Sequence, residues 1–387
     1  MNKQNIFVFL QNIKIIMKKI FQLFAIAILA IACSKSDNGV NEPDNSFNRN
    51  ALLTNWADNI IVPSYIDYQT KTSTLVTDVN TFNANPNANN LQIVRNSWIA
   101  AYKSYQYISM YNIGKATDIY LKEATNTFPT DIIAINANIA SGTYDLTKFS
   151  QWSKIGLPAM DYLINGLGTN DADIIAFYST NANAVNYKKY LFDVSNKLKF
   201  DAKSIVDDWN SGFKTAYIAN DGTSVNSSVN KTTNNFVKNL EKDIRTNKLG
   251  IPAGIFSAGM LYPNKVEAFY KNDISKILLN ESLKAAKDFF IGKHFNSNTT
   301  GESLKSYLDF LNSNRNNQKL SDIINDQFAL VLTTNNNLNN SFSNQVSNDN
   351  SKMLDAYNVL QQNVVYTKLD MMQALNISID YVDGDGD

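Results

Sequence analysis

The chain has 387 residues, and its 35 Lys and Arg balance its 35 Asp and Glu, so the formal net charge at pH 7 is zero. Balanced charge without a basic block argues against nucleic acid as a partner. A single cysteine cannot form an intramolecular disulfide, so the 44% of residues that are hydrophobic must supply the core on their own.

The first predicted element is an export signal. Met17 and two lysines precede an apolar run over residues 20–32, which is the charged-then-apolar pattern of a secretory signal. The run is too short to span a bilayer. It ends in small residues followed by Cys33, the pattern of a bacterial lipobox, in which the cysteine receives a lipid. We therefore predict a signal peptide over 1–32 and lipidation at Cys33, with Met17 as an alternative start to Met1.

A polar segment separates this lipidation site from the body of the chain. Residues 33–50 are poor in apolar side chains and contain Pro43, which indicates a flexible tether. The lipid would hold the protein at the outer membrane of the cell envelope. Whether it would lie on the periplasmic or the surface face is left open by the sequence.

The body after residue 50 shows helical periodicity and hardly any strand alternation. Apolar residues recur at steps of three and four, which places them on one face of a helix. Helices that each bury one face pack into bundles, so we predict an all-α fold. The apolar stripes fall within residues 91–108, 187–213, 278–290, 320–331 and 353–369.

Asparagine-rich stretches with few apolar side chains separate these helical segments. They cover residues 83–90, 220–230, 296–301 and 335–350. The second stretch lies near the middle of the body, with about four helices on each side of it. We therefore predict an N-terminal helical bundle over 51–222 and a C-terminal helical bundle over 223–387.

Four short motifs follow one another along the body. The first is Trp56-Ala-Asp-Asn-Ile-Ile-Val-Pro63 with Trp98-Ile-Ala-Ala-Tyr102, and the second is Gly156-Leu-Pro-Ala-Met-Asp161. The third joins Glu241-Lys-Asp-Ile-Arg245 to Lys248-Leu-Gly-Ile-Pro-Ala-Gly254, and the fourth is the ending Asp383-Gly-Asp-Gly-Asp387. In this order the motifs resemble those of imelysin-like proteins, which are exported bacterial proteins historically grouped with an insulin-cleaving peptidase. The third motif resembles a branch common in Bacteroidetes lipoproteins.

The resemblance implies two helical bundles, with the family's Gly-x-His-x-x-Glu signature near their interface. His and Glu three residues apart share one helical face and can both reach a metal. Here Pro158 stands at the position of the His and Asp161 at that of the Glu, while a further acid of many relatives aligns near Ser109. One carboxylate does not make a transition-metal site, so we expect no metal, with a divalent cation as the minor alternative.

Other catalytic and metal-binding chemistry finds few residues to support it. The sole histidine is His294, and lipidation would consume the sole thiol, so Ser-His and Cys-His catalysis lack a base or a nucleophile. We expect His294 at a helix end or on the surface. Asp383, Asp385 and Asp387 alternate like the start of a calcium loop, but a solvated or interface-packed acidic end is the preferred interpretation.

These observations predict a non-catalytic, lipid-anchored binding or accessory protein. The resemblance implies a link to iron uptake, through an outer-membrane receptor or a small iron-related ligand. We expect Asp161 and Tyr162 on one wall of a groove between the bundles, and Arg245 and Lys248 on the other, where an anionic group would fit. Gly156 completes the predicted ligand-binding residues. A divergent metal-dependent peptidase and a purely structural envelope protein remain the alternatives.

Overall fold

The computed structural model describes residues 46–381. The predicted signal peptide, the lipidation site Cys33, most of the tether and the three terminal aspartates lie outside the described residues. Helices make up nearly all of the regular structure within the described part, which confirms the all-α prediction. The only strands there are β1 (Asn314–Arg315) and β2 (Gln318–Lys319), which pair antiparallel in a short hairpin.

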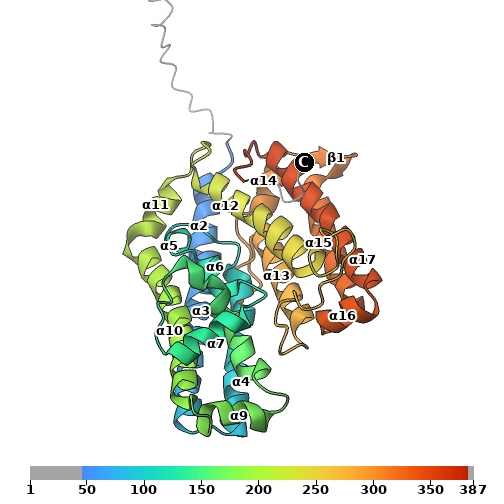
Figure 1. Ribbon diagram of the computed structural model, residues 1–387. Helices are drawn as coiled ribbons and strands as arrows, with labels where there is room; N and C mark the ends of the chain where they lie inside the picture. Colours follow the sequence, from blue (N-terminus) through green and yellow to red (C-terminus); the bar gives the residue numbers. More distant parts are fainter. Residues whose placement is uncertain (1–45, 382–387) are drawn as a thin grey trace, which may run out of the picture. The chain divides into compact units, whose positions relative to one another are not determined.

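Three long helices form the centre of a first helix group: α3 (Val62–Ala84), α4 (Ala88–Ile108) and α10 (Ala184–Asp208). Helix α3 packs along both of the others (Figure 1). The group is completed by α2 (Arg49–Asn55), η1 (Trp56–Ile61), α5 (Lys115–Asp118), α6 (Leu121–Asn126), α7 (Ile132–Ser141), η2 (Phe149–Lys154), α8 (Gly156–Asp161), η3 (Tyr162–Gly166), α9 (Asp171–Ser179), η4 (Trp209–Phe213) and α11 (Lys214–Ala219).

A second helix group follows in the chain, built on η5 (Asn239–Gly250), α13 (Ser275–Phe290), α15 (Leu320–Thr334) and α17 (Ser351–Val365). Helix α17 packs on η5 and α15, while α13 packs on α15 and also on α4, so that it joins the two groups. The domain boundary that we predict after residue 222 falls between the two groups and stays a prediction. The remaining elements are α12 (Ser228–Lys238), α14 (Leu304–Phe310), η6 (Asn335–Asn337), α16 (Phe342–Asn348), η7 (Tyr366–Met371) and α18 (Met372–Ala374).

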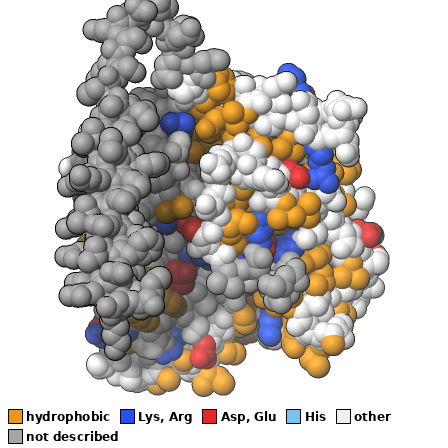
Figure 2. Space-filling model, turned by 90° about the horizontal axis from the view of Figure 1, so that it is seen from above, with side chains coloured by type: hydrophobic (Ala, Val, Ile, Leu, Met, Phe, Trp, Pro, Cys, Tyr) orange, Lys and Arg blue, Asp and Glu red, His pale blue; other side chains and the backbone are white. Residues whose placement is uncertain are grey.

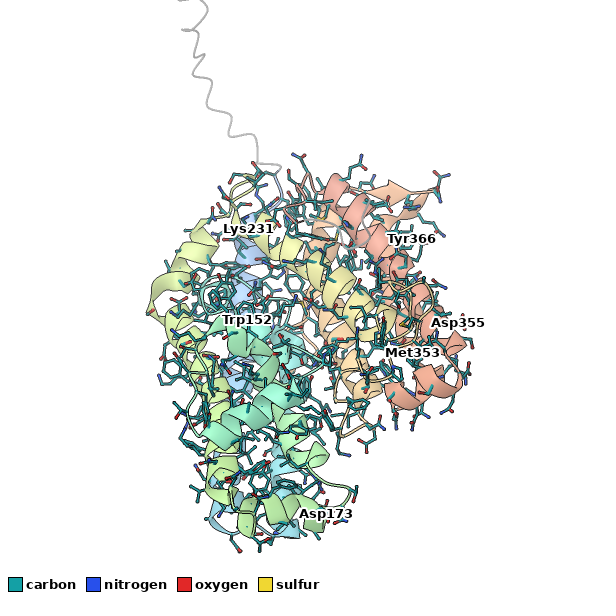
Figure 3. The ribbon with its side chains drawn as sticks, viewed as in Figure 1. Trp152, Asp173, Lys231, Met353, Asp355 and Tyr366 are labelled. Atoms are coloured by element: carbon teal, nitrogen blue, oxygen red, sulfur yellow. The ribbon has the colours of Figure 1, made fainter. Side chains whose placement is uncertain are left out.

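The predicted apolar stripes coincide with helices whose buried faces form the core. In α17, Met353 is fully buried, whereas Asp355, two residues further on, is exposed (Figure 3). The breaks agree less closely. The interruption expected over 335–350 contains helix α16, because Phe342 and Val346 bury one face of it despite the surrounding asparagines.

Several helical segments are wound more widely than an α-helix. Within residues 46–381, five segments have the π form, with bonds from each N–H to the carbonyl five residues earlier: η1, η3, η4, η5 and η7. Such wide turns are rare and often lie at functional sites. Here η3 follows Asp161, η5 carries Arg245 and Lys248, and η7 carries Lys368, so three of the wide turns hold or adjoin buried charged groups.

The surface of the described part carries charges of both signs. On the face seen in Figure 2, basic and acidic side chains are interspersed among polar and apolar ones. None of the helices within residues 46–381 is both long and apolar enough to cross a membrane.

Candidate functional site

Asp161 is a fully buried carboxylate at the end of α8. Its oxygens accept hydrogen bonds from the backbone N–H groups of Tyr270 (2.8 Å) and Lys271 (2.9 Å), and from the side-chain amide of Asn165 (2.9 Å). Burial raises the pKa of Asp161 to about 7 in spite of these three donors, because desolvation penalises the charged form. The side chain thus fastens the backbone of residues 270–271, which precede α13, to helix α8.

The residues around Asp161 have structural roles that explain their identities. Gly156 begins α8 with φ +78°, and a Cβ there would collide with the backbone carbonyl of Thr125, so only glycine fits. Pro158 lies in the first turn of α8, where a missing N–H costs nothing. The indole of Trp98 donates to the carbonyl of Leu157 (3.0 Å) and ties this turn to α4.

The residues at the three positions where relatives carry metal-ligand side chains are not suited to binding a metal ion. Pro158 offers no ligand atom, and the oxygens of Asp161 already face three N–H donors, which a cation would oppose. At the third position considered, the Ser109 hydroxyl donates to the carbonyl of Gln106 (3.3 Å) and accepts from Asn239 (3.2 Å). Among residues 46–381, no three His, Cys, Asp or Glu side chains gather closely enough to hold an ion.

Tyr162 contacts the same segment as Asp161. Its ring packs against that of Tyr270 with centroids 5.3 Å apart, and its hydroxyl bonds with the amide of Asn136 (3.0 Å). The structure therefore brings Asp161 and Tyr162 together, and both stabilise residues 270–271. Whether either one contacts a ligand stays a prediction.

Lys248 lies in a second buried cluster, with an acid that sequence analysis missed. Its ammonium forms an ion pair with Glu267 and donates to Gln106 Oε1 (2.9 Å). Glu267 also accepts from the amides of Asn126 (2.8 Å) and Gln106 (3.3 Å). The Lys248 and Glu267 side chains are only 5% and 2% exposed, so the pair is desolvated, and each member has a further hydrogen-bond partner besides the other. We call Gln106, Asn126, Lys248 and Glu267 the Lys248 cluster.

Arg245 belongs to a third cluster, away from Asp161. Its guanidinium lies 3.9 Å from the carboxylate of Glu241 and 5.2 Å from the ring centroid of Tyr357. Glu241 also bonds Lys368 (2.9 Å) and accepts from the hydroxyl of Tyr381 (2.8 Å). Of the two predicted basic wall residues, Lys248 is linked through Glu267 to the segment that Asp161 holds, whereas Arg245 lies beside Glu241.

A cleft opens beside the Lys248 cluster. It has a volume of about 490 Å³, with walls from α6 and the following residues 127–129 on one side, and from Asn247, Ile251 and Lys265 on the other. A small adjoining cavity of about 30 Å³ shares Lys122, Asn126 and Asn247 with the cleft and is also lined by Lys248. The described structure therefore contains a cleft with both polar and apolar walls between elements of the two helix groups, and Lys248 lies next to it, in the lining of the small cavity.

Among the site residues that the sequence patterns did not indicate, Glu267 has a weak signal. Glu267 stands between Val266 and Ala268 in a stretch without helical periodicity, and an acid enclosed by apolar neighbours indicates a buried, paired charge. Lys122 and Asp243, which form an ion pair at the small cavity, lie more than a hundred residues apart and gave no such signal.

A sequence model of the imelysin family, peptidase family M75, matches residues 61–366. The chain belongs to the imelysin family. No protein of curated function matches it.

Two solved structures share the imelysin-like fold. One is an imelysin-like protein from Psychrobacter arcticum 273-4, with a TM-score of 0.65 and 16% identity over 87% of this chain and 99% of that one. The other is described as an iron-regulated protein A precursor from Parabacteroides distasonis ATCC 8503, with a TM-score of 0.67 and 16% identity over 84% and 95% of the two chains. At such identities the likeness establishes the fold, which agrees with the resemblance drawn from the motifs.

Proposed function

We propose that this imelysin-family chain is a non-catalytic binding protein of the cell envelope, anchored by a lipid on Cys33 and engaged in iron uptake. The proposal rests on helix α8, which holds the positions of the family's Gly-x-His-x-x-Glu signature. Pro158 replaces its imidazole, and the remaining Asp161 is occupied by three N–H donors, so the helix holds the fold together and offers no reactive group. The name of the Parabacteroides protein supports the link to iron.

The ligand site in this proposal is the 490 Å³ cleft beside the Lys248 cluster. Its volume suits a small molecule, and its walls combine Phe128 and Ile251 with polar groups. Lys122 is already paired with Asp243, whereas no carboxylate within residues 46–381 pairs with Lys265, so Lys265 is the cation that would attract an anionic ligand. An anionic iron chelate such as ferric citrate has this chemistry, whereas a bare cation would be repelled by the Lys265 ammonium.

Ferric citrate binding to the purified full chain tests the cleft. We expect titration calorimetry to give saturable binding, weakened about fivefold by Lys265→Gln through the loss of about 1 kcal/mol of charge attraction. Lys265 stacks on the ring of Tyr262, 3.8 Å from its centroid, and borders the cleft without belonging to the buried ion pairs. Lys287→Gln, on α13 outside the cleft lining, serves as the matched control.

Four results would overturn the cleft as an iron-chelate site or the non-catalytic role. If ferric citrate does not bind, or if Lys265→Gln and Lys287→Gln bind it equally well, the cleft is not the ligand site. Stoichiometric zinc or iron in protein purified without chelators, lost on Asp161→Ala, would support the divergent metallopeptidase instead. Cleavage of insulin by the purified chain, abolished by the same substitution, would do the same.

The anchor is tested separately by Cys33→Ser. We expect the wild-type chain to fractionate with membranes and the variant with the aqueous fraction, because two acyl chains hold a protein on a bilayer and their loss releases it. A variant that stays with the membranes at wild-type levels would show that another part of the protein holds it there.

A further inference from the structure

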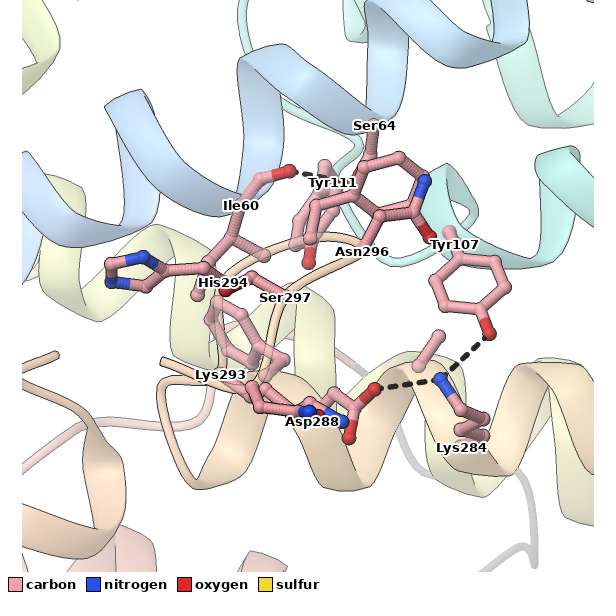
Figure 4. A pocket seen from close by; sticks show the side chains of 14 residues that line it. Ile60, Ser64, Tyr107, Tyr111, Lys284, Asp288, Lys293, His294, Asn296 and Ser297 are labelled. Atoms are coloured by element: carbon pink, nitrogen blue, oxygen red, sulfur yellow. Dashed lines mark hydrogen bonds and ion pairs between the residues drawn. The ribbon is translucent and has the colours of Figure 1, made fainter. Parts of the chain in front are cut away.

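A second cavity, of about 290 Å³, is separate from the cleft. Its walls come from η1 and α3, from the end of α4, from α13, and from the loop over residues 291–300 that follows α13 (Figure 4). None of the predicted ligand-binding residues lines it. His294, which we expect at a helix end or on the surface, lies in this loop, half-buried at the cavity wall.

The loop is held in a defined conformation by backbone bonds. Lys293 pairs with Thr300 in an antiparallel bridge, and the N–H of His294 donates to the carbonyl of Thr299 (2.9 Å). The N–H of Phe295 donates to the carbonyl of Asn59 in η1 (2.8 Å). The backbone of this loop is therefore fixed before any ligand arrives, which reduces the entropic cost of binding.

Two lysines line the cavity, and their contacts within residues 46–381 differ. The Lys284 ammonium donates to Asp288 (2.9 Å) and to the Tyr107 hydroxyl (3.1 Å), so its charge is balanced (Figure 4). By contrast, no side chain among residues 46–381 bonds to the Lys293 ammonium or to the His294 ring. The lining consequently carries a net positive charge and an imidazole without a bonding partner.

Four aromatic side chains also line the cavity, beside aliphatic residues and the polar side chains of the loop. Tyr111 and Phe289 contact each other with centroids 5.6 Å apart, and Phe295 packs edge-on against Tyr107 at the same distance. The volume lies at the lower end of the range for small-molecule sites, and it far exceeds the roughly 30 Å³ that one water occupies. Such a cavity suits an apolar body with one anionic group.

We propose that this cavity binds a small organic carboxylate, with the carboxylate at Lys293 and His294 and the apolar body against Tyr111, Phe289 and Phe295. Lys293 supplies the charge, and the imidazole supplies a directed hydrogen bond. The Lys284–Asp288 pair closes one side and keeps a second anion from being attracted there. This site is independent of the cleft and of any role in iron uptake.

His294 provides a direct probe, because it is the only histidine in the 387 residues. In untagged full chain, the imidazole carbon-bound protons give a single set of nuclear magnetic resonance signals that reports on this cavity alone. We expect benzoate to move these signals with saturation, and benzyl alcohol, which has the same ring without the charge, to leave them nearly unchanged. Lys293→Gln should weaken benzoate binding about tenfold, whereas Lys287→Gln should not.

Three results of these titrations would contradict the proposed carboxylate site. A linear shift without saturation, or a saturable shift that is equal in wild type and Lys293→Gln, would overturn the proposal. Equal responses to benzoate and benzyl alcohol would identify an apolar cavity rather than an anion site, and would also overturn it. If circular dichroism shows that Lys293→Gln is misfolded, calorimetric titration of His294→Gln replaces it, with the same loss of benzoate affinity expected.

Discussion

Two buried acids hold the segment between η5 and α13, and they are neutralised in opposite ways. Glu267 lies on the segment and pairs with the Lys248 cation. Asp161 lies on α8, and its hydrogen-bond donors within residues 46–381 are uncharged N–H groups of Tyr270, Lys271 and Asn165. A buried carboxylate that pairs with a cation depends on that one cation. A buried carboxylate that accepts hydrogen bonds from uncharged N–H groups can instead become neutral by taking up a proton.

The largest effect is expected from removing the cation. Lys248→Met leaves Glu267 buried with two amides and no opposite charge, which should lower the free energy of unfolding by about 3–5 kcal/mol. Urea denaturation followed by circular dichroism measures it. Lys293→Gln, at the open cavity, should stay within about 0.5 kcal/mol of wild type.

A double substitution sharpens this test. In Lys248→Met with Glu267→Gln, no uncompensated charge remains, so a substantial part of the lost stability should return. If the double variant is as unstable as the sum of the two single variants, the ion pair does not determine the stability of this site.

A smaller effect, with a characteristic pH dependence, is expected at Asp161. Asp161→Asn places an amide nitrogen against N–H donors and should lower the free energy of unfolding by about 1–3 kcal/mol at pH 5. The folded pKa of Asp161, about 7, exceeds the ordinary value of 3.8, so the folded state binds more protons than the unfolded state between these limits. The stability that Asp161 contributes to the folded state through this raised pKa is therefore complete below pH 4, and it is lost as the pH rises through 7.

The comparison of wild type with Asp161→Asn isolates this group from the other carboxylates. The stability advantage of wild type should be largest at pH 4 and should decrease as the pH rises to 7, by about 1.4 kcal/mol per pH unit at most, and should then level off. Urea titrations at four pH values measure it. An advantage that is constant or increases with pH would mean that Asp161 is ionised in the folded protein throughout this range.

The sequence predicts the long helices well because their apolar spacing is regular. The stripes over 91–108 and 278–290 coincide with α4 and α13. Helix α16 was missed because its asparagines conceal the two apolar residues, Phe342 and Val346, that bury it. Periodicity depends on side chains that face a core, and a short helix offers few of them.

The candidate site was less predictable, for a geometric reason. Lys248 and Arg245 both lie on η5, whose wide π turns change the angle between successive side chains, so an α-helical spacing cannot show which way they face. The sequence placed both on one wall of a groove, whereas the structure directs Lys248 to Glu267 and Arg245 to Glu241. The partners of buried charges come from distant parts of the chain, and spacing does not reveal them.

The strap formed by residues 267–271 has a consequence for how the protein melts. Glu267 at one end of it bonds to side chains of α4 and α6, and Tyr270 and Lys271 at the other end bond to α8. Neither helix group can separate from the other without exposing an acid that has lost its partners. Loss of one group therefore removes support from the other, and the described body is expected to denature cooperatively, in a single step.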